Sequence, residues 1–162
     1  MKRLFLLVAL VFGTASGCDN GDALPDSVAT LSPTGKIQVN VARDVQLDLS
    51  ERLATQLNPD VTVGKVTGEP RVEKIGDDYF LVTNFDQADK EASCLTTAVR
   101  LDLAEGNKLG LLSAYAGKAP QGDTCSGVAC SQCKLMSNNE GNFCSCLQQA
   151  LPNGYCNHST GG

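Results

Sequence analysis

The chain has 162 residues, of which 13 are Lys or Arg and 18 are Asp or Glu, so its formal net charge at pH 7 is −5. An acidic chain without a basic cluster is a poor match for nucleic acid or for anionic lipid headgroups, because both are bound through Lys and Arg. With no Trp, three Tyr and five Phe, the core of such a chain must rest mainly on aliphatic side chains.

The first 17 residues have the layout of a secretory signal peptide. Lys2 and Arg3 are followed by an apolar run over residues 4–12 and then by small residues up to Gly17. The apolar run is too short for a membrane-spanning helix, which needs roughly 20 apolar residues. Residues 1–17 are therefore predicted to be an export signal that is removed from the mature protein.

Ala15, Ser16, Gly17 and Cys18 resemble the lipobox of bacterial lipoproteins. The resemblance implies that Cys18 carries acyl chains and becomes the new N-terminus, whereas an ordinary signal peptide would leave Cys18 as a plain thiol. Acyl chains contribute roughly 0.8 kcal/mol per buried methylene group, so they would hold the protein on a membrane. Without the signal, 11 Lys plus Arg face 18 Asp plus Glu, a formal charge of −7. We expect a protein of the bacterial cell envelope whose membrane partner is reached through this lipid anchor.

Residues 18–35 are polar, contain two prolines and lack a sustained period of 2 or 3.6, which predicts a flexible tether. The pattern changes to short alternating segments over residues 36–120, which predicts a β-rich body. We expect strands at residues 36–41, 45–49, 61–66, 71–75, 79–85, 95–103 and 108–115. Ser50 is expected to cap one short helix that ends before Pro59.

The strands of this body are separated mostly by tight turns, such as residues 76–78 and 104–107. Tight turns favour antiparallel pairing. The predicted fold class is therefore mainly β, an antiparallel meander of barrel or sandwich type with about one short helix. A small, disulfide-stapled module over residues 121–162 is expected to follow.

No catalytic motif is present in the body: the sequence has no nucleotide-binding glycine loop after a strand and no GxSxG. The carboxylates of Asp77, Asp78, Asp86 and Asp89 fall in predicted turns and loops, where solvated charge is the ordinary interpretation. His158 is the only histidine and lies close to the C-terminus, a poor place for a catalytic group that needs a fixed orientation. The sequence thus predicts neither a catalytic residue nor a cofactor.

Six of the eight cysteines lie in the last 38 residues: Cys125, Cys130, Cys133, Cys144, Cys146 and Cys156. This segment has too few large apolar side chains to pack a core unaided, and such exported modules are usually held by disulfides. A hairpin with its turn at residues 138–141 would bring the cysteine pairs together. Six cysteines allow fifteen pairings, and the sequence does not choose among them. Cys94 is either a free thiol or a link between body and tail.

Metal binding is the alternative interpretation of the same cysteines. Cys125, Cys130 and Cys133 have the spacing of a plant-type [2Fe–2S] ferredoxin loop. A tetrahedral zinc site could instead draw its ligands from Cys130, Cys133, Cys144, Cys146, Cys156 and His158. Disulfides are favoured over both, because an oxidising envelope converts unmetallated pairs into cross-links. A disulfide module does not require His158, whereas a Cys/His zinc site does.

The motifs CSGVACSQC, CSC and CNHS resemble the cysteine-rich C-terminus of small, uncharacterised lipoproteins of bacteria of the Bacteroidota group. The resemblance implies envelope localisation and a shared architecture, and it carries no established activity. The predicted function is that of an exported, lipid-anchored envelope protein with a binding or structural role toward an unknown protein or small-molecule ligand. The alternative is a metal-binding or thiol-redox module in the envelope.

Overall fold

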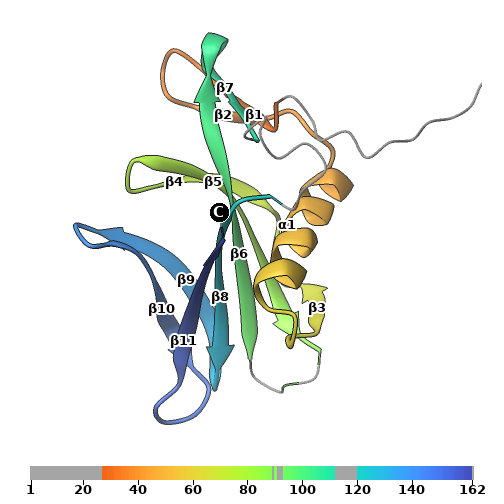
Figure 1. Ribbon diagram of the computed structural model, residues 1–162, viewed down its shortest axis with the longest axis vertical. Helices are drawn as coiled ribbons and strands as arrows, with labels where there is room; N and C mark the ends of the chain where they lie inside the picture. The colour runs from red at the N-terminus through yellow and green to blue at the C-terminus, as the bar shows by residue number, and fades with distance from the viewer. Residues whose placement is uncertain (1–26, 89, 91–92, 112–119, 162) are drawn as a thin grey trace, which may run out of the picture.

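The computed structural model describes residues 27–88, 90, 93–111 and 120–161 (Figure 1). The expected signal peptide, Cys18 and the first part of the expected tether lie outside these residues, and so does the end of the strand expected over residues 108–115. No helix in the described part of the chain has the length and apolar character that a membrane span requires.

The described chain is mainly β with one α-helix. Its elements are β1 (Ala29–Leu31), β2 (Ile37–Val39), α1 (Arg43–Leu57), β3 (Val63–Val66), β4 (Arg71–Ile75), β5 (Asp78–Gln87), β6 (Cys94–Ala104), η1 (Glu105–Asn107), β7 (Lys108–Gly110), β8 (Gly122–Val128), β9 (Cys130–Asn138), β10 (Gly141–Gln149) and β11 (Tyr155–Gly161). The predicted hairpin at residues 71–85 is β4 and β5, and the predicted turn at residues 104–107 coincides with η1.

Nine strands form one antiparallel sheet, and β9 and β10 form a separate two-stranded sheet. The long strand β6 lies at the centre: β5 pairs with one edge, while β8 and then β7 pair with the other. The outer strands are β3 and β4 beside β5, β11 beside β8, and β1 and β2 beyond β7. The prediction of a mainly β, antiparallel fold with one helix is confirmed, and the sheet does not close into a barrel.

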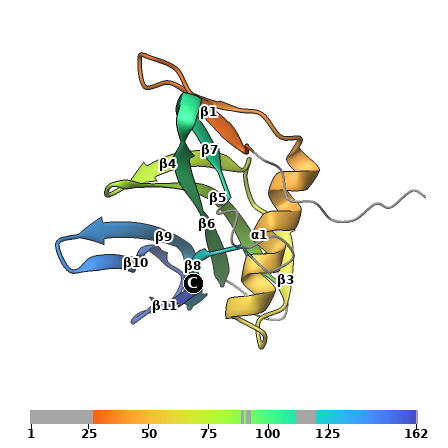
Figure 2. The same ribbon diagram turned by 45° about the horizontal axis from the view of Figure 1, so that its top comes forward.

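Helix α1 covers one face of the sheet, and the β9–β10 hairpin lies on the other (Figure 2). Under the helix, Leu49 and Leu53 pack against Leu81, Val99 and Leu101 of β5 and β6, and all five are buried. These strand residues occupy alternate positions, as expected where one face of a strand is covered.

The prediction of a strand at residues 45–49 and of a helix starting at Ser50 is wrong, because a single helix spans Arg43–Leu57. Val45, Leu49, Leu53 and Leu57 recur every four residues and all pack in or against the core under the helix. Ser50 is no cap: it is fully buried, and its hydroxyl hydrogen-bonds that of Thr83 at 2.7 Å. The apparent alternation of residues 45–49 is one turn of an amphipathic helix.

The expected tether is also shorter than predicted, because β1 falls inside residues 18–35. Val28 and Ala29 are fully buried, and β1 pairs with both β2 and β7. One short apolar patch without a visible period is enough for a three-residue strand when two neighbours supply its hydrogen bonds.

Residues 121–162 continue the sheet of the body. β8 pairs with β6 over residues 95–99, and β11 extends the sheet beyond β8. The chain then folds over the sheet as the β9–β10 hairpin, whose turn lies at residues 138–141 as predicted. Residues 121–162 therefore supply both an edge of the sheet and the cover of one of its faces.

Candidate functional site

Three disulfides cross-link residues 121–162, which confirms the prediction of a disulfide-stapled segment. The pairs are Cys125–Cys144, Cys130–Cys146 and Cys133–Cys156. Their Cα atoms lie 5.6 to 6.0 Å apart, within the usual range. Each bond joins β8 or β9 to β10 or β11, so together they hold the hairpin against the sheet.

Cys94 is the one free thiol among the cysteines that the structure describes, so it forms no disulfide with residues 121–162. It is 7% exposed, and its Sγ accepts a hydrogen bond from the backbone N–H of Cys133 at 2.9 Å. Burial raises the pKa of the Cys94 thiol above its usual value of 9.0, and the nearby backbone N–H groups offset this only in part.

Five sulfur atoms gather beside the sheet, and we call them the sulfur cluster: Cys94, Cys130, Cys133, Cys146 and Cys156. Two overlapping triplets within it have all Sγ atoms within 4.8 Å of one another and could hold a metal ion as thiolates. Four of the five are joined in disulfides here, and a metal ligand must be a free thiolate. Neither triplet contains Cys144 or His158 from the zinc set expected from the sequence.

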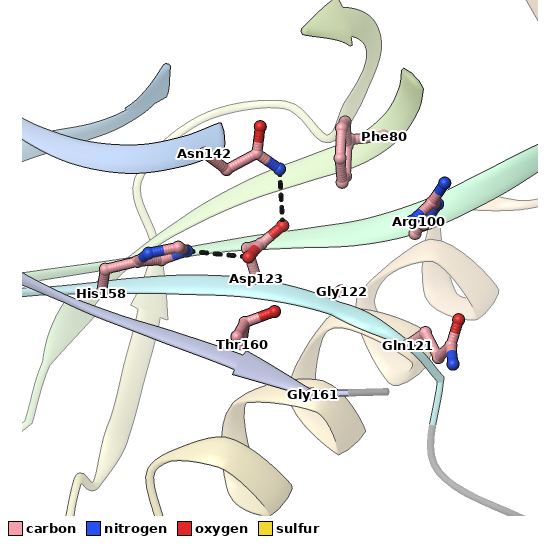
Figure 3. Close-up of a pocket in the computed structure, with 9 residues that line it drawn as sticks. All are labelled: Phe80, Arg100, Gln121, Gly122, Asp123, Asn142, His158, Thr160 and Gly161. Carbon is pink, nitrogen blue, oxygen red and sulfur yellow. Dashed lines mark hydrogen bonds and ion pairs between the residues drawn. The ribbon is translucent and has the colours of Figure 1, made fainter. Parts of the chain in front are cut away.

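A pocket of about 400 Å³ lies where β8, β11 and the hairpin meet (Figure 3). Its lining is Phe80, Arg100, Gln121, Gly122, Asp123, Asn142, His158, Thr160 and Gly161. These residues come from β5, β6, β8, β10 and β11 and from the residue before β8, so the pocket exists only when the tail is folded onto the body.

Asp123 organises this pocket. One carboxylate oxygen is 2.7 Å from His158 Nε2, and the other accepts a hydrogen bond from the side-chain amide of Asn142 at 3.1 Å (Figure 3). The Asp123 side chain is 8% exposed and that of His158 is 27% exposed. A carboxylate buried to this degree is stable only when hydrogen bonds replace its water, and these two bonds do so.

Arg100 and Phe80 complete the pocket's chemistry. Arg100 is half exposed and pairs with Asp78 at 2.9 Å and more distantly with Asp102 at 3.9 Å. Phe80 also belongs to the lining, but it is only 1% exposed, so little of its ring can touch a ligand. The lining therefore combines hydrogen-bond donors, acceptors and one aromatic ring, with its charges already paired.

Asp123, Asn142 and the pairing of His158 were not predicted from the sequence. A signal was nevertheless present, because Asp123, Asn142 and His158 each lie two residues from a disulfide cysteine. On a strand, residues two apart share a face, so disulfides between strands bring such neighbours together as well. The sequence does not reveal which cysteines pair, so it could not identify the set.

No family model, no curated protein and no solved structure matches the chain. The likeness of its cysteine motifs to small Bacteroidota lipoproteins therefore stays an expectation. What the protein binds has to be inferred from the pocket and the sulfur cluster themselves.

Proposed function

We propose that the protein is exported, is held in the cell envelope by acyl chains on Cys18, and binds a small uncharged polyhydroxylated ligand, such as a sugar unit, in the pocket around Asp123. The observation that carries the proposal is the buried Asp123 carboxylate, which holds His158 and Asn142 in place at the wall of an open pocket.

The location is supported by the sequence and by the cross-links. The charged, apolar and small segments before Cys18 have the order of an export signal, and Ala15 to Cys18 resemble a lipobox. Three disulfides in one domain are typical of proteins that fold in an oxidising compartment.

The ligand class follows from size and charge. The pocket volume of about 400 Å³ falls at the small end of the range of small-molecule sites, roughly 300 to 1,000 Å³. Arg100 is neutralised by Asp78 and Asp102, and Asp123 is bonded to His158, so the lining does not call for a charged ligand. Hydroxyl groups both donate and accept hydrogen bonds, which suits a lining that mixes the two kinds of group.

A disulfide fixes the geometry of this pocket. On β8, Cys125 follows Asp123 by two residues, and on β10, Cys144 follows Asn142 by two residues. The Cys125–Cys144 disulfide therefore lies next to the Asp123–Asn142 hydrogen bond. A side-chain pair held in this way is already arranged before a ligand arrives, and the entropy cost of binding is reduced.

Titration of the mature protein with glucose, galactose, mannose and N-acetylglucosamine, followed by NMR chemical shifts, tests the ligand class. We expect saturable binding of at least one sugar with shifts confined to the pocket, and about a tenfold weakening in Asn142→Ala. Asn157→Ala is the matched control, because Asn157 lies on β11 but does not line the pocket. No saturable shifts with any of the sugars, or equal weakening in both variants, would remove this ligand class.

The anchor is tested separately with Cys18→Ser. The variant should leave the membrane fraction, because the sequence around Cys18 has neither a basic patch nor an amphipathic helix that could replace acyl chains. A variant that stays on the membrane after a carbonate wash would show that the lipoprotein interpretation is wrong.

A second candidate function is thiol or metal chemistry at the sulfur cluster. The observation that favours it is the gathering of two disulfides and a free thiol within a few ångströms. This candidate does not involve the Asp123 pocket, and the two can be tested independently.

A further inference from the structure

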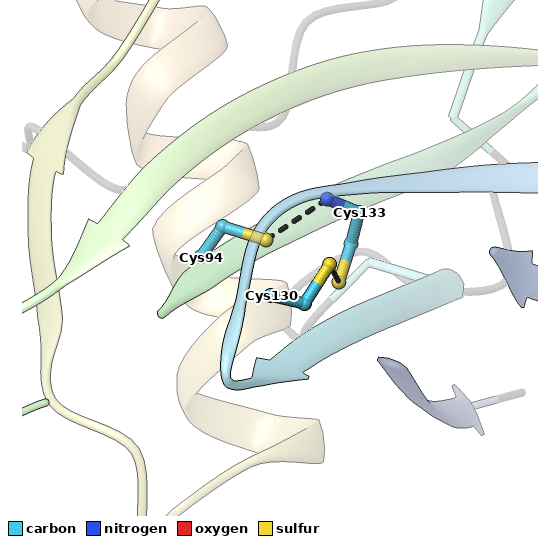
Figure 4. A group of neighbouring side chains, drawn as sticks. All are labelled: Cys94, Cys130 and Cys133. Carbon is cyan, nitrogen blue, oxygen red and sulfur yellow. Dashed lines mark hydrogen bonds between the residues drawn. The ribbon is translucent and has the colours of Figure 1, made fainter. Parts of the chain in front are cut away.

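The sulfur cluster places a free thiol beside two disulfides that are themselves in contact. Cys94 Sγ lies within 4.8 Å of the Sγ atoms of both Cys130 and Cys133 (Figure 4). Cys130 Sγ in turn is 3.4 Å from Cys156 Sγ and 3.9 Å from Cys133 Sγ, although it is bonded to neither. A thiolate exchanges with a disulfide by direct attack on one of its sulfurs, so this arrangement brings the reactants together before any reaction.

We propose that the sulfur cluster is a thiol–disulfide exchange centre in which Cys94 is the resident thiol and Cys133–Cys156 is the bond that it opens. Cys94 loses its proton to water, and its thiolate attacks Cys133 Sγ. The Cys94–Cys133 bond forms while the Cys133–Cys156 bond breaks, and Cys156 leaves as a thiolate that can take up a proton. The number of disulfides is unchanged, so the step needs no oxidant or reductant.

The backbone favours Cys133 as the sulfur that is attacked. Its N–H donates to Cys94 Sγ at 2.9 Å, and its C=O accepts a hydrogen bond from the Thr96 hydroxyl at 2.9 Å. These two bonds fix the Cys133 backbone against β6, the strand that begins with Cys94. The same N–H would also stabilise the charge of a Cys94 thiolate.

The exchange transfers the free thiol from a buried cysteine to a partly exposed one. Cys94 is buried, whereas Cys156 is partly exposed on β11, an edge strand of the sheet. From there the Cys156 thiolate can attack a low-molecular-weight disulfide, RSSR. This second step forms Cys156–SSR and releases RS⁻, so atoms and electrons again balance.

A cavity of about 220 Å³ adjoins the Cys94 and Cys133 end of the cluster, and Cys156 does not line it. Cys94 and Cys133 both line it, together with Thr67, Asn84, Thr96, Ser131, Gln132 and Gln148. All of these companions are polar and uncharged. The cavity can therefore supply the water that takes the proton of Cys94, whereas a small neutral disulfide such as bis(2-hydroxyethyl) disulfide meets Cys156 on the edge strand β11.

Burial keeps the thiol protonated until the pH is raised. Three charged groups, Arg71 and Glu73 of β4 and Lys134 of β9, line a neighbouring cavity that also reaches Cys133. Arg71 and Glu73 pair with each other. Because the pKa of Cys94 is raised by burial, the exchange rate should rise roughly tenfold per pH unit through the neutral range, in step with the thiolate fraction.

Peptide mapping of the mature protein tests the first step. Trypsin separates Cys94 on residues 91–100 from Cys125, Cys130 and Cys133 on residues 119–134, and from the last three cysteines on residues 135–162. After incubation between about pH 7 and pH 9, acid quenching and alkylation in denaturant, we expect residues 91–100 linked to residues 119–134, with the alkyl group on residues 135–162. If the alkyl group is found only on residues 91–100 at every pH, the proposal is wrong.

The second step is tested with bis(2-hydroxyethyl) disulfide as the probe. We expect the mixed disulfide on residues 135–162 in the wild type and none in Cys94→Ala or Cys94→Ser. Cys125→Ala/Cys144→Ala is the matched control: it removes the disulfide outside the cluster and should exchange as the wild type does. An adduct on Cys94 alone, or an adduct on residues 135–162 without Cys94, would contradict the proposal. Either result would leave the sugar proposal untouched, because the pocket and the cluster are different sites.

Discussion

The two faces of the sheet are covered in different ways. Under α1, aliphatic side chains such as Leu49, Leu53, Leu81 and Val99 are at most 1% exposed. Under the β9–β10 hairpin, much of the buried set is cysteine. The hairpin also leaves Met136, Phe143 and Leu147 more than a third exposed.

A small domain can therefore cover one face of its sheet with a segment that has few apolar residues. A helix that buries an aliphatic stripe is stabilised mainly by the hydrophobic effect, at roughly 25 cal/mol per Å². Under the hairpin, half of the buried cluster is cysteine, and the cross-links act by restricting the unfolded chain. The disulfide-covered face is also where the pocket and the sulfur cluster lie, so the cross-links fix functional geometry as well.

Removal of residues 121–162 should have the largest effect, because it takes away the whole cover of one face. From the sequence this segment looks separable, but in the structure β8 pairs with the central strand β6 over residues 95–99. Without it, Phe80, Val82 and Ala98 lose their cover. We expect the shortened chain to lose cooperative unfolding in urea. A sharp transition close to that of the full mature chain would show that the helix-covered face folds alone.

The substitution Leu53→Ala removes buried apolar surface from the helix-covered face only. Leu53 is fully buried, and a buried Leu→Ala substitution costs about 2 to 5 kcal/mol. Urea unfolding should show this loss while non-reducing peptide maps show the same three disulfides. Leu103→Ala is the matched control, since Leu103 is 54% exposed and its substitution should cost less than about 0.5 kcal/mol. Mispaired disulfides in Leu53→Ala would show that the two faces do not form independently.

The double substitution Cys125→Ala/Cys144→Ala removes a disulfide from the hairpin-covered face and leaves the cysteines of the sulfur cluster unchanged. The bond spans a sequence separation of 19, and its removal should cost about 2 to 4 kcal/mol of unfolding free energy. Because α1 and the β9–β10 hairpin lie on opposite faces of the sheet, combining this change with Leu53→Ala should give a loss within about 0.5 kcal/mol of the sum. A clear departure from additivity in urea unfolding would show that cross-linking and helix packing are coupled.

The sequence predicted the strands best where the alternation was long and the turns were distinct. The β4–β5 hairpin, β6 and the hairpin turn at residues 138–141 were all predicted. The helix was predicted too short because residues 45–49 fit a period of 2 as well as one helical turn. Strand β1 was missed because a three-residue strand is set by its neighbours β2 and β7 rather than by its own pattern.

The candidate site was predictable only in part. The expected export signal, the oxidising compartment that it implies and a shortage of apolar residues indicated disulfides, and disulfides are present. The pairing was not predictable, because it depends on how the hairpin folds back over β8 and β11. The Asp123–His158 contact depends on that same fold, since the two residues lie 35 apart in the chain and meet across neighbouring strands.

The smallest effect that we expect is a pH dependence from Cys94, the free thiol on the disulfide-covered face. Burial raises the pKa of Cys94 above 9.0, while the unfolded chain keeps the usual value. Well below pH 9 the thiol is protonated in both states and stability does not change. Above it the unfolded chain loses its proton first, so the free energy of unfolding should fall by up to about 1.4 kcal/mol per pH unit. Urea unfolding of the wild type and of Cys94→Ala between pH 7 and pH 10.5 measures the difference, which removes the contributions of other titrating groups. Parallel curves for the two proteins would mean that solvent reaches the thiol freely and that this face is more open than its burial indicates.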